Sequence, residues 1–132
     1  MRIFVYGTLK RGLSNHGHMA GQQFITVART LPHYRLADCR GYPGMYPVRE
    51  GGLAIAGEIW EVDELGRAKL DILEDVALGM YALEPVALQP VPDAPTAAGN
   101  AEAGETVFTY IYKWPVSGLP DAGDEWREGG KA

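Results

Sequence analysis

RIFVYGTLKRG, residues 2–12, predicts a buried strand that ends in a glycine turn. Isoleucine, phenylalanine, valine and tyrosine favour a strand, and Gly7 permits backbone angles that other residues avoid. Successive main-chain N–H groups in such a turn can form a concave anion site, and a following helix N-terminus adds to its field. We therefore expect an anion-binding turn or an ordinary tight turn at residues 6–12, and the residues alone favour the ordinary turn.

The spacing of Gly7 and Gly12 matches the first part of a phosphate-binding loop. Leu13 and Ser14 follow, where that motif needs a lysine to reach the phosphates. Nucleotide binding is therefore not expected.

Beyond residue 12, the sequence consists of strand-like and turn-like segments before and after one definite helix. Asp63 is an N-cap candidate for this helix, and Gly57 marks a bulge or a close approach of two backbones. We expect a short helix over 14–20, capped by Ser14 or Asn15, and then two short strands or one kinked edge strand over 22–37. A turn at 41–44 and a strand over 53–62 precede the helix over 63–74. Two further strands are expected over 80–91 and 105–114.

This order of elements lacks the regular alternation of a doubly wound fold. It predicts an α+β protein whose mixed sheet curls toward a barrel. In the definite helix, one face is expected to be apolar and to pack on that sheet, formed by Leu65, Ala68, Leu70, Ile72 and Leu73.

Two segments lie outside this core. Three closely spaced prolines mark a long loop over 92–105, which is either a tolerated insertion or a lid. We divide the chain into a domain over 1–116 and a C-terminal extension over 117–132. The extension is expected to be solvated, with Trp114 or Trp126 attaching it to the body.

The composition predicts one globular domain. The 132 residues suffice for one core, and 46% hydrophobic with 22% charged residues is typical of globular proteins. No apolar run approaches the roughly 18 residues that span a bilayer. Lys10 and Arg11 interrupt the first apolar stretch too early for a signal peptide. We therefore expect a cytoplasmic protein.

The net charge of −5 argues against nucleic-acid and acidic membrane partners. Residues 1–60 carry seven cationic and three anionic side chains, and residues 61–132 carry five and fourteen. The first half thus has a modest positive field that suits a small anionic ligand, although scattered solubilising charge explains it equally well. The cations concerned are Lys10, Arg11, Arg35 and Arg40.

The histidines and the single cysteine predict no metal site. His16 and His18 are two residues apart, His33 stands alone, and no further ligands accompany them. Cys39 cannot form an internal disulfide, and without an evident base it is interpreted as a packing residue rather than a nucleophile.

Three carboxylates, Asp71, Glu74 and Asp75, gather at the end of the predicted helix. Asp71 and Glu74 share a helix face, and Glu74 follows Leu73 and so could point inward. A buried carboxyl beside another has a raised pKa, which suits a general acid/base near neutral pH. A solvated acidic face is the alternative, and the pattern alone favours it because carboxylates are mostly exposed.

Five motifs in this order resemble the gamma-glutamylcyclotransferase family, also called AIG2-like. They are FVYGTLKRG at 4–12, GYPG at 41–44, GEIWEV at 57–62, LDILE at 70–74, and Tyr81. The resemblance covers about residues 2–112, and YGTL together with LDxxE carries most of it.

The resemblance implies a small mixed β-barrel with flanking helices and a cavity between the YGTL turn and a catalytic glutamate. Glu74 aligns with that glutamate. The turn is then expected to bind the glutamyl part of the substrate, largely through main-chain groups, and two further tyrosines are expected to line the cavity. The substrate-binding residues so implied are Tyr6, Gly7, Thr8, Leu9, Tyr81 and Tyr110.

The implied reaction converts a gamma-glutamyl amine or amino acid to 5-oxoproline and the free amine. The α-amine attacks its own γ-carbonyl, Glu74 acts as general acid/base, and neither a metal nor an organic cofactor is required. The sequence departs from the family at Asp75, where glycine is common, and at Ala82, where arginine is frequent. These departures leave the substrate open, since they stand beside the implied site.

Two other functions stay open from the sequence. A non-catalytic module that binds a small anion on the same fold is the alternative, motivated by the departures around Glu74. A protein-interaction domain that uses the acidic second half rests on the charge asymmetry alone.

Overall fold

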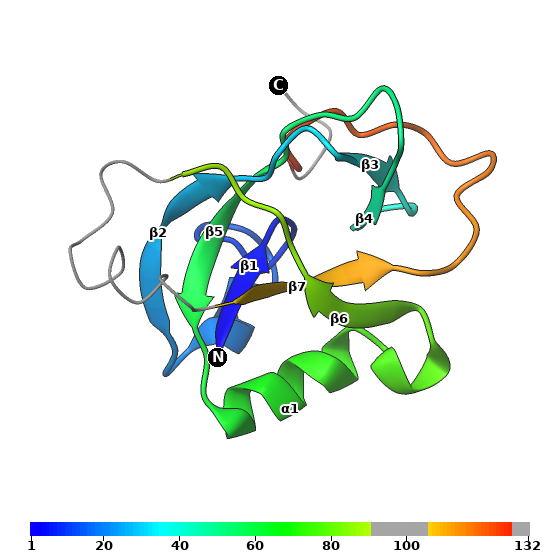
Figure 1. The fold of residues 1–132 in the computed structure, drawn as a ribbon. Coiled ribbons are helices and arrows are strands. Elements are labelled where there is room, and N and C mark those ends of the chain that lie inside the picture. The colour runs from blue at the N-terminus through cyan, green and yellow to red at the C-terminus, as the bar shows by residue number, and fades with distance from the viewer. Residues whose placement is uncertain (91–105, 128–132) are drawn as a thin grey trace.

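A computed structural model of the chain describes residues 1–90 and 106–127 (Figure 1). The strands in these residues are β1 (Arg2–Val5), β2 (Gln23–Arg29), β3 (Tyr34–Asp38), β4 (Pro43–Pro47), β5 (Ala56–Glu61), β6 (Tyr81–Pro85) and β7 (Val107–Tyr112). The helices are the 3-10 helix η1 (His16–Met19), the α-helix α1 (Glu64–Leu73) and the 3-10 helix η2 (Val76–Leu78). No helix of this described part is long and apolar enough to cross a membrane.

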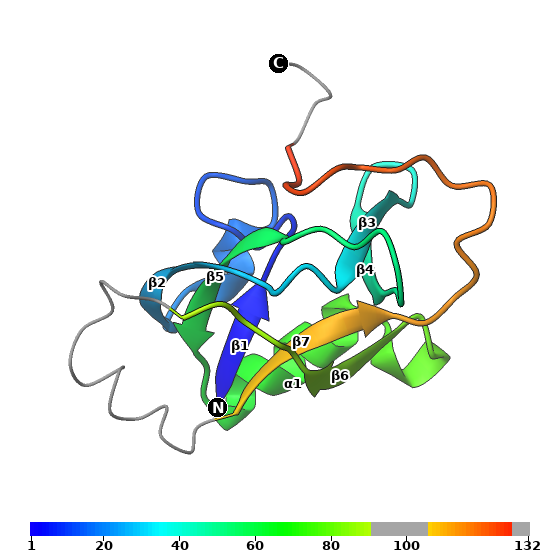
Figure 2. The same ribbon diagram turned by 45° about the horizontal axis from the view of Figure 1, so that its top comes forward.

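The seven strands form one mixed sheet in the order β2-β5-β1-β7-β4-β3, and β6 pairs with β7. β1 is antiparallel to β5 and parallel to β7, and β3 and β4 form an antiparallel hairpin. β7 joins two parts of the sheet, because its first half pairs with β1 and its Ile111 pairs with Met45 of β4. The β3–β4 hairpin consequently lies on one side of β7, and α1 lies on the other (Figures 1 and 2).

This architecture confirms the predicted α+β class with a mixed sheet. The strand pairings of the described residues close no ring, so the predicted barrel is better described as a curled open sheet. β2 and β3 stand at the two ends of the strand order and do not pair with each other. Isolated bridges, such as Thr30 with Leu88, cover part of the open edge instead.

The first strand is buried on both faces, as its sequence predicts. Ile3 and Val5 pack in one hydrophobic cluster with Leu70 of the helix, and Phe4 packs in a second cluster with Met45. Successive side chains of a strand point to opposite faces, so a run of apolar residues suits a strand covered on both sides. β1 is thereby fixed in the core, and the turn that follows it begins at a defined place.

Helix α1 begins where the sequence predicts, because the Asp63 side chain accepts a hydrogen bond from Gly66 N at 2.7 Å. The predicted apolar face is wrong in part, since Leu65 is 67% exposed and Ile72 is 77% exposed. The helix packs through Leu70 and through Gly66, where a Cβ would lie 2.6 Å from the Gln22 side chain. Gly66 and Leu70 thus mark the buried side of the helix, which matches the predicted apolar face only in part.

One strand begins inside the segment for which the residues predict a turn. The predicted turn at 41–44 begins earlier, at Arg40 and Gly41, which have positive φ angles of 71° and 109°. Pro43 and Gly44 already belong to β4 and pair with β3. Pairing with a neighbouring strand therefore overrides the turn propensity of these residues.

The remaining strand predictions hold with shorter bounds. Residues 22–37 do form two strands, of which β2 lies at one end of the sheet. The bulge lies in β2 between Phe24 and Thr26, and Gly57 is a point of close approach to β1. The loop over 92–105 lies outside the described residues, so its role as insertion or lid stays a prediction.

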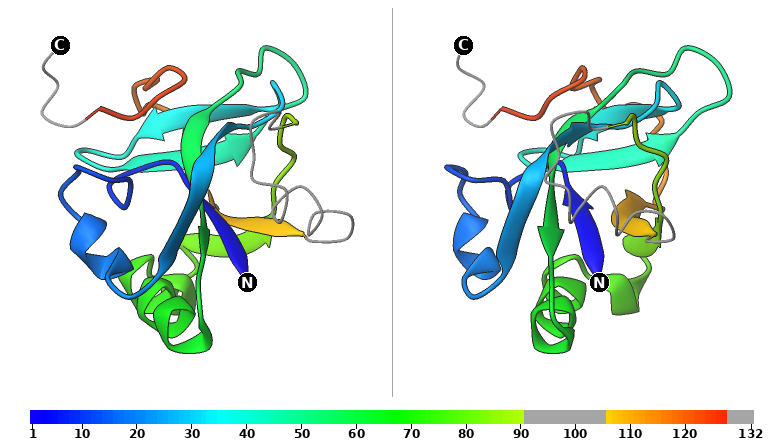
Figure 3. Two further views of the ribbon diagram at one scale, coloured as in Figure 1. Left: turned by 90° about the vertical axis from the view of Figure 1, so that its left-hand side faces the viewer. Right: turned by 60° about the vertical axis from the view of Figure 1, so that its left-hand side comes forward.

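Residues 117–127 are attached to the sheet by main-chain hydrogen bonds and by Trp126, one of the two tryptophans predicted for this role, while most of their side chains are exposed. Asp38 N donates to Pro120 O at 2.8 Å, and Ala122 N donates to Leu36 O at 2.9 Å. Trp126 is 7% exposed, whereas Trp114 is 41% exposed. The segment passes over the β3–β4 hairpin (Figure 3), where it pairs main-chain groups that an edge strand leaves open.

Candidate active site

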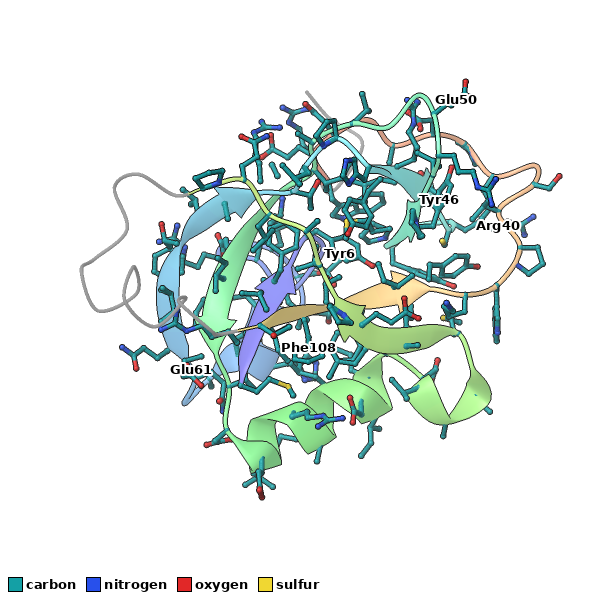
Figure 4. All side chains as sticks on the ribbon, in the orientation of Figure 1. Tyr6, Arg40, Tyr46, Glu50, Glu61 and Phe108 are labelled. Atoms are coloured by element: carbon teal, nitrogen blue, oxygen red, sulfur yellow. The ribbon has the colours of Figure 1, made fainter. Side chains whose placement is uncertain are left out.

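A cavity of about 250 Å³ opens where β1 ends. Its walls come from the turn after β1, residues 42–43, the end of α1 with the following residues, β6 and β7. All the residues that the sequence predicts for the site line this one cavity: Tyr6, Gly7, Thr8, Leu9, Glu74, Tyr81 and Tyr110. Tyr6 lies in the interior of the molecule (Figure 4). The sheet topology thus brings four distant segments together, and the chemical role of each residue stays a prediction.

The turn after β1 is held by short hydrogen bonds. Lys10 N donates to Gly7 O at 3.1 Å, Asn15 N donates to Thr8 O at 2.9 Å, and Asn15 Nδ2 donates to Thr8 Oγ1 at 2.8 Å. Within residues 1–90 and 106–127, the N–H groups of Gly7, Thr8 and Leu9 donate no hydrogen bond to the protein. These three main-chain donors therefore have no protein acceptor, which is a condition that an anion-binding turn must meet.

Glycine at position 7 lets this turn approach the segment before β4. A Cβ on Gly7 would lie 2.6 Å from Cγ of Pro43, closer than real Cβ atoms come to a neighbour. The YGTL and GYPG motifs therefore form opposite sides of one contact.

Three buried tyrosines of the cavity direct their hydroxyl hydrogens to protein acceptors. Tyr6 Oη donates to Tyr110 O at 2.6 Å, and Tyr81 Oη donates to Pro43 O at 2.5 Å. Tyr110 Oη donates to Asp71 Oδ1 at 2.7 Å. Burial raises the pKa of all three phenols, and the charge of Glu74, which lines the same cavity, raises each of them further.

Glu74 is the C-cap residue of α1, half-buried at the cavity wall. Burial raises the pKa of Glu74 from its ordinary value of 4.5 to about 7, and the neighbouring charge of Asp75 contributes. The alternative of a solvated acidic face therefore does not describe Glu74. A carboxyl with this pKa can accept and donate a proton at neutral pH.

The backbone conformation at Asp75 is one that glycine, the residue common at this position in the family, adopts easily. Its φ of 50° lies in the left-handed region, which follows many helix ends and which glycine adopts without strain. Aspartate is among the residues that tolerate this conformation, so the turn keeps its shape while the site gains a charge.

Sequence reasoning missed several lining residues, among them Asn15, Tyr42, Pro43 and Met80. Two of them belong to the GYPG motif, which local chemistry predicts only as a turn. Asn15 is predicted as a helix cap, but its side chain makes no cap hydrogen bond and holds Thr8 instead. These residues reach the cavity through contacts between distant segments, for which the local sequence gives no signal.

None of the four residues of the predicted cationic field lines the cavity. Arg11 pairs with Glu58 at 3.2 Å, Arg35 pairs with Asp121 at 2.9 Å, and Arg40 lies at the edge of the molecule (Figure 4). The buried Lys10 donates from Nζ to Trp126 O at 3.1 Å. Lys10 and Arg11 line a separate, wider cleft. The cavity therefore offers an anion main-chain donors rather than cations.

Metal-ligating side chains do not gather in the part of the chain that the structure describes, where no three of them form a group. Cys39 is buried and packs in the hydrophobic cluster on the helix side, as predicted for a packing residue.

The fold and the cavity define a small α+β protein in which a glycine turn and a carboxyl of near-neutral pKa line one cavity. The chain belongs to the AIG2-like gamma-glutamyl cyclotransferase family, whose model, "Gamma-glutamyl cyclotransferase, AIG2-like", matches residues 3–128.

Relatives from several organisms support this membership. The gamma-glutamylcyclotransferase family protein YtfP of Escherichia coli is 31% identical over 119 residues, which are 90% of this chain and 88% of that protein. A relative from Vibrio cholerae is 46% identical over 74 residues, or 56% of this chain. The matches span 62%, 57% and 52% of the relatives from Vibrio cholerae, Arabidopsis thaliana and Drosophila melanogaster.

Solved structures share the fold. An aig2-like protein from Mus musculus is 28% identical with a TM-score of 0.74, covering 98% of this chain and 89% of that one. The solution structure of ytfP from Escherichia coli is 29% identical with a TM-score of 0.63, covering 96% and 95%.

Proposed function

We propose that this protein is a gamma-glutamyl cyclotransferase that releases an amine from a gamma-glutamyl group and forms 5-oxoproline. One observation carries the proposal: a carboxyl with a pKa of about 7 lines a small cavity together with a turn that offers free main-chain N–H groups. Cyclisation needs one base, one acid and one oxyanion site, and these groups can supply all three.

In this mechanism the α-nitrogen of the glutamyl group attacks its own γ-carbonyl carbon. The new C–N bond closes the five-membered ring, and the C–N bond to the leaving amine breaks. Of the three protons on the α-ammonium group, one stays on the ring nitrogen and two end on the leaving amine. Glu74 takes a proton from the α-nitrogen and returns one to the leaving nitrogen, so it is unchanged after each turnover.

The turn at residues 7–9 contributes electrostatic stabilisation. Its N–H groups are fixed before the reaction, because hydrogen bonds from Lys10 and Asn15 hold the turn. Donors fixed in this way stabilise a developing oxyanion without reorganisation. Confining the substrate in a small cavity favours the folded conformation that cyclises, since both reacting groups belong to one molecule.

The test is the formation of 5-oxoproline by the purified protein. Gamma-glutamyl amines and gamma-glutamyl amino acids are incubated with it, and the products are followed by mass spectrometry. Formation of 5-oxoproline with an equal amount of free amine supports the proposal. Tight binding of these ligands without any product would instead favour the non-catalytic module.

The pH dependence of activity should follow Glu74. The carboxylate is the form that accepts the proton, so kcat/KM should fall about tenfold per pH unit below a pKa of about 7. In Asp75→Asn the acidic limb of the pH–activity profile should move to lower pH, because the like charge beside Glu74 is removed. Asparagine still tolerates the left-handed φ of this position. The limb should remain above 4.5, since burial is the larger cause of the raised pKa.

Asp75→Gly is the matched control for this shift. Glycine also removes the charge and adopts a φ of 50° without strain, so both variants should give the same pH profile. A limb that stays in place in both variants would contradict the assigned effect of Asp75 on Glu74.

The charges of the cavity predict which leaving group is preferred. Its ordinarily charged lining residues are Glu74 and Asp75, and none of the described lining residues is lysine or arginine. A leaving amino acid brings a carboxylate that finds no cation there, whereas a leaving amine brings none. We expect kcat/KM to be about tenfold higher for gamma-glutamyl-pentylamine than for gamma-glutamyl-norleucine, which differs only by the carboxylate. Equal values for the two substrates would show that the leaving carboxylate stays in solvent.

A further inference from the structure

The cavity phenols differ in what they can still offer to a ligand. Tyr6 Oη donates to Tyr110 O and also accepts from Met45 N at 3.1 Å, so it is engaged in both directions. Tyr81 Oη donates to Pro43 O, and Tyr110 Oη donates to Asp71 Oδ1. A hydroxyl has one donor hydrogen, so Tyr81 and Tyr110 can offer a ligand only their acceptor lone pairs.

Asp71 fixes the direction of the Tyr110 hydrogen bond. An ionised carboxylate accepts hydrogen bonds and donates none, so the phenol beside it must be the donor. Arg67 Nε lies 3.7 Å from Asp71 Oδ2, one helical turn earlier, and forms an i,i+4 ion pair with this carboxylate. Asp71 stands three residues before Glu74 on α1, so one helix supplies both groups to the same side of the site.

Two kinds of polar group line the cavity. The main-chain N–H groups of residues 7–9 have no protein acceptor, and Tyr81, Tyr110 and Glu74 carry oxygens that can accept a hydrogen bond. A ligand that complements both kinds of group carries an anionic or carbonyl oxygen at one end and an N–H cation at the other. The α-amino acid end of a gamma-glutamyl group has this arrangement.

We propose that Asp71 is a positioning residue that makes the Tyr110 phenol an acceptor for the α-ammonium group of the substrate. The proposal rests on the proposed function, and it extends the site to a residue that does not line the cavity. Without the Asp71 carboxylate, the Tyr110 hydroxyl can rotate and turn its hydrogen toward the ammonium group, which then loses an acceptor. Asp71 acts through Tyr110 and touches no reacting atom.

The kinetic test uses Asp71→Ala, Tyr110→Phe and the double variant. A hydrogen bond to a charged group is removed in each, so KM should rise about tenfold or more, and kcat should change less than about threefold. The double variant should resemble Tyr110→Phe, because Asp71 has nothing left to position. A further rise in KM when Asp71 is removed from Tyr110→Phe would overturn the proposal.

Glu64→Ala is the control for the loss of a carboxylate from this helix. Glu64 is exposed in the first turn of α1 and does not line the cavity, so its loss should leave KM unchanged. Both variants remove one negative charge from α1. A rise in KM with Glu64→Ala equal to that with Asp71→Ala would overturn the proposal, since it would show a general effect of helix charge.

A binding comparison separates positioning from a merely structural role. Dissociation constants are measured for gamma-glutamyl-pentylamine and for its analogue without the α-amino group, glutaric acid monopentylamide. In Asp71→Ala and Tyr110→Phe the first should bind about tenfold more weakly, and the second as in the parent protein. Equal weakening of both ligands would overturn the proposal, because a distorted cavity does not distinguish them.

This comparison is made in the Glu74→Gln protein when the parent turns the ligand over, and in the parent when it does not. A protein that forms no 5-oxoproline contradicts the proposed function, and the amino-group dependence of binding still decides the role of Asp71. Loss of the amino-group effect in an active enzyme contradicts the role of Asp71 alone.

Discussion

Glu74→Gln should lower kcat for 5-oxoproline formation by a factor of about 10²–10⁴. Glutamine keeps the size of the side chain and its polarity, but it can neither take the proton from the α-nitrogen nor return one to the leaving amine. The rate is measured as 5-oxoproline formed per minute by mass spectrometry at pH 8. The dissociation constant for the substrate should change much less than kcat, since the turn and the phenols remain.

Glu64→Gln is the control for this experiment, because Glu64 belongs to the same helix and is exposed. Its activity should equal that of the parent protein. A Glu74→Gln protein that keeps activity within about threefold of the parent would contradict the acid/base role.

The stability of Glu74→Gln shows whether a loss of activity comes from unfolding. The folded pKa of Glu74, about 7, lies above its ordinary value of 4.5, so the fold favours the protonated form. The parent protein therefore loses stability as pH rises from 4.5 to 7, by up to about 3 kcal/mol, and glutamine does not. Urea unfolding should find the variant at least as stable as the parent at pH 8, with the difference vanishing near pH 4.

Gly57→Ala should destabilise the fold by about 1–3 kcal/mol or more. A Cβ at this position would lie 2.5 Å from Val5 O and 2.5 Å from Cζ of Phe4. Val5 O belongs to the backbone of the central strand β1, so it cannot move aside as the end of a flexible side chain can. Because Val5 directly precedes Tyr6, a displacement of Val5 also shifts the turn at residues 7–9. KM should therefore rise together with the loss of stability.

Gly17→Ala is the matched control, because nothing lies within 4 Å of a Cβ at Gly17 and its φ is not positive. Urea unfolding should place this variant within about 0.5 kcal/mol of the parent. An equally neutral Gly57→Ala would contradict this prediction. It would show that β1 and β5 separate more easily than the close approach at Gly57 indicates.

Local sequence determines the elements whose causes are local. The apolar run at residues 2–6 predicts β1, and Asp63 predicts the start of α1 through its own side chain. The YGTL and LDxxE motifs likewise indicate the family, and the family model matches residues 3–128. The residues that these motifs indicate for the site line one cavity. Each of these signals lies within a few residues of the feature that it predicts.

Features decided by distant contacts are the ones that local sequence misses. The segment at β4 has turn residues, and only pairing with β3 and the contact of Met45 with Ile111 make it a strand. The exposed Leu65 and Ile72 have the spacing of a buried face, but the packing of α1 leaves them in solvent and buries Gly66 and Leu70.

The sequence by itself determined the strand, the capped helix and a set of residues that line one cavity, because their signals are motifs of neighbours along the chain. Only the tertiary structure decided the chemistry of the site. The pKa of Glu74 depends on its burial, and the direction of the Tyr110 hydrogen bond depends on Asp71, 39 positions away. Burial and hydrogen-bond direction are properties of surroundings assembled from distant segments, and these exist only once the chain is folded.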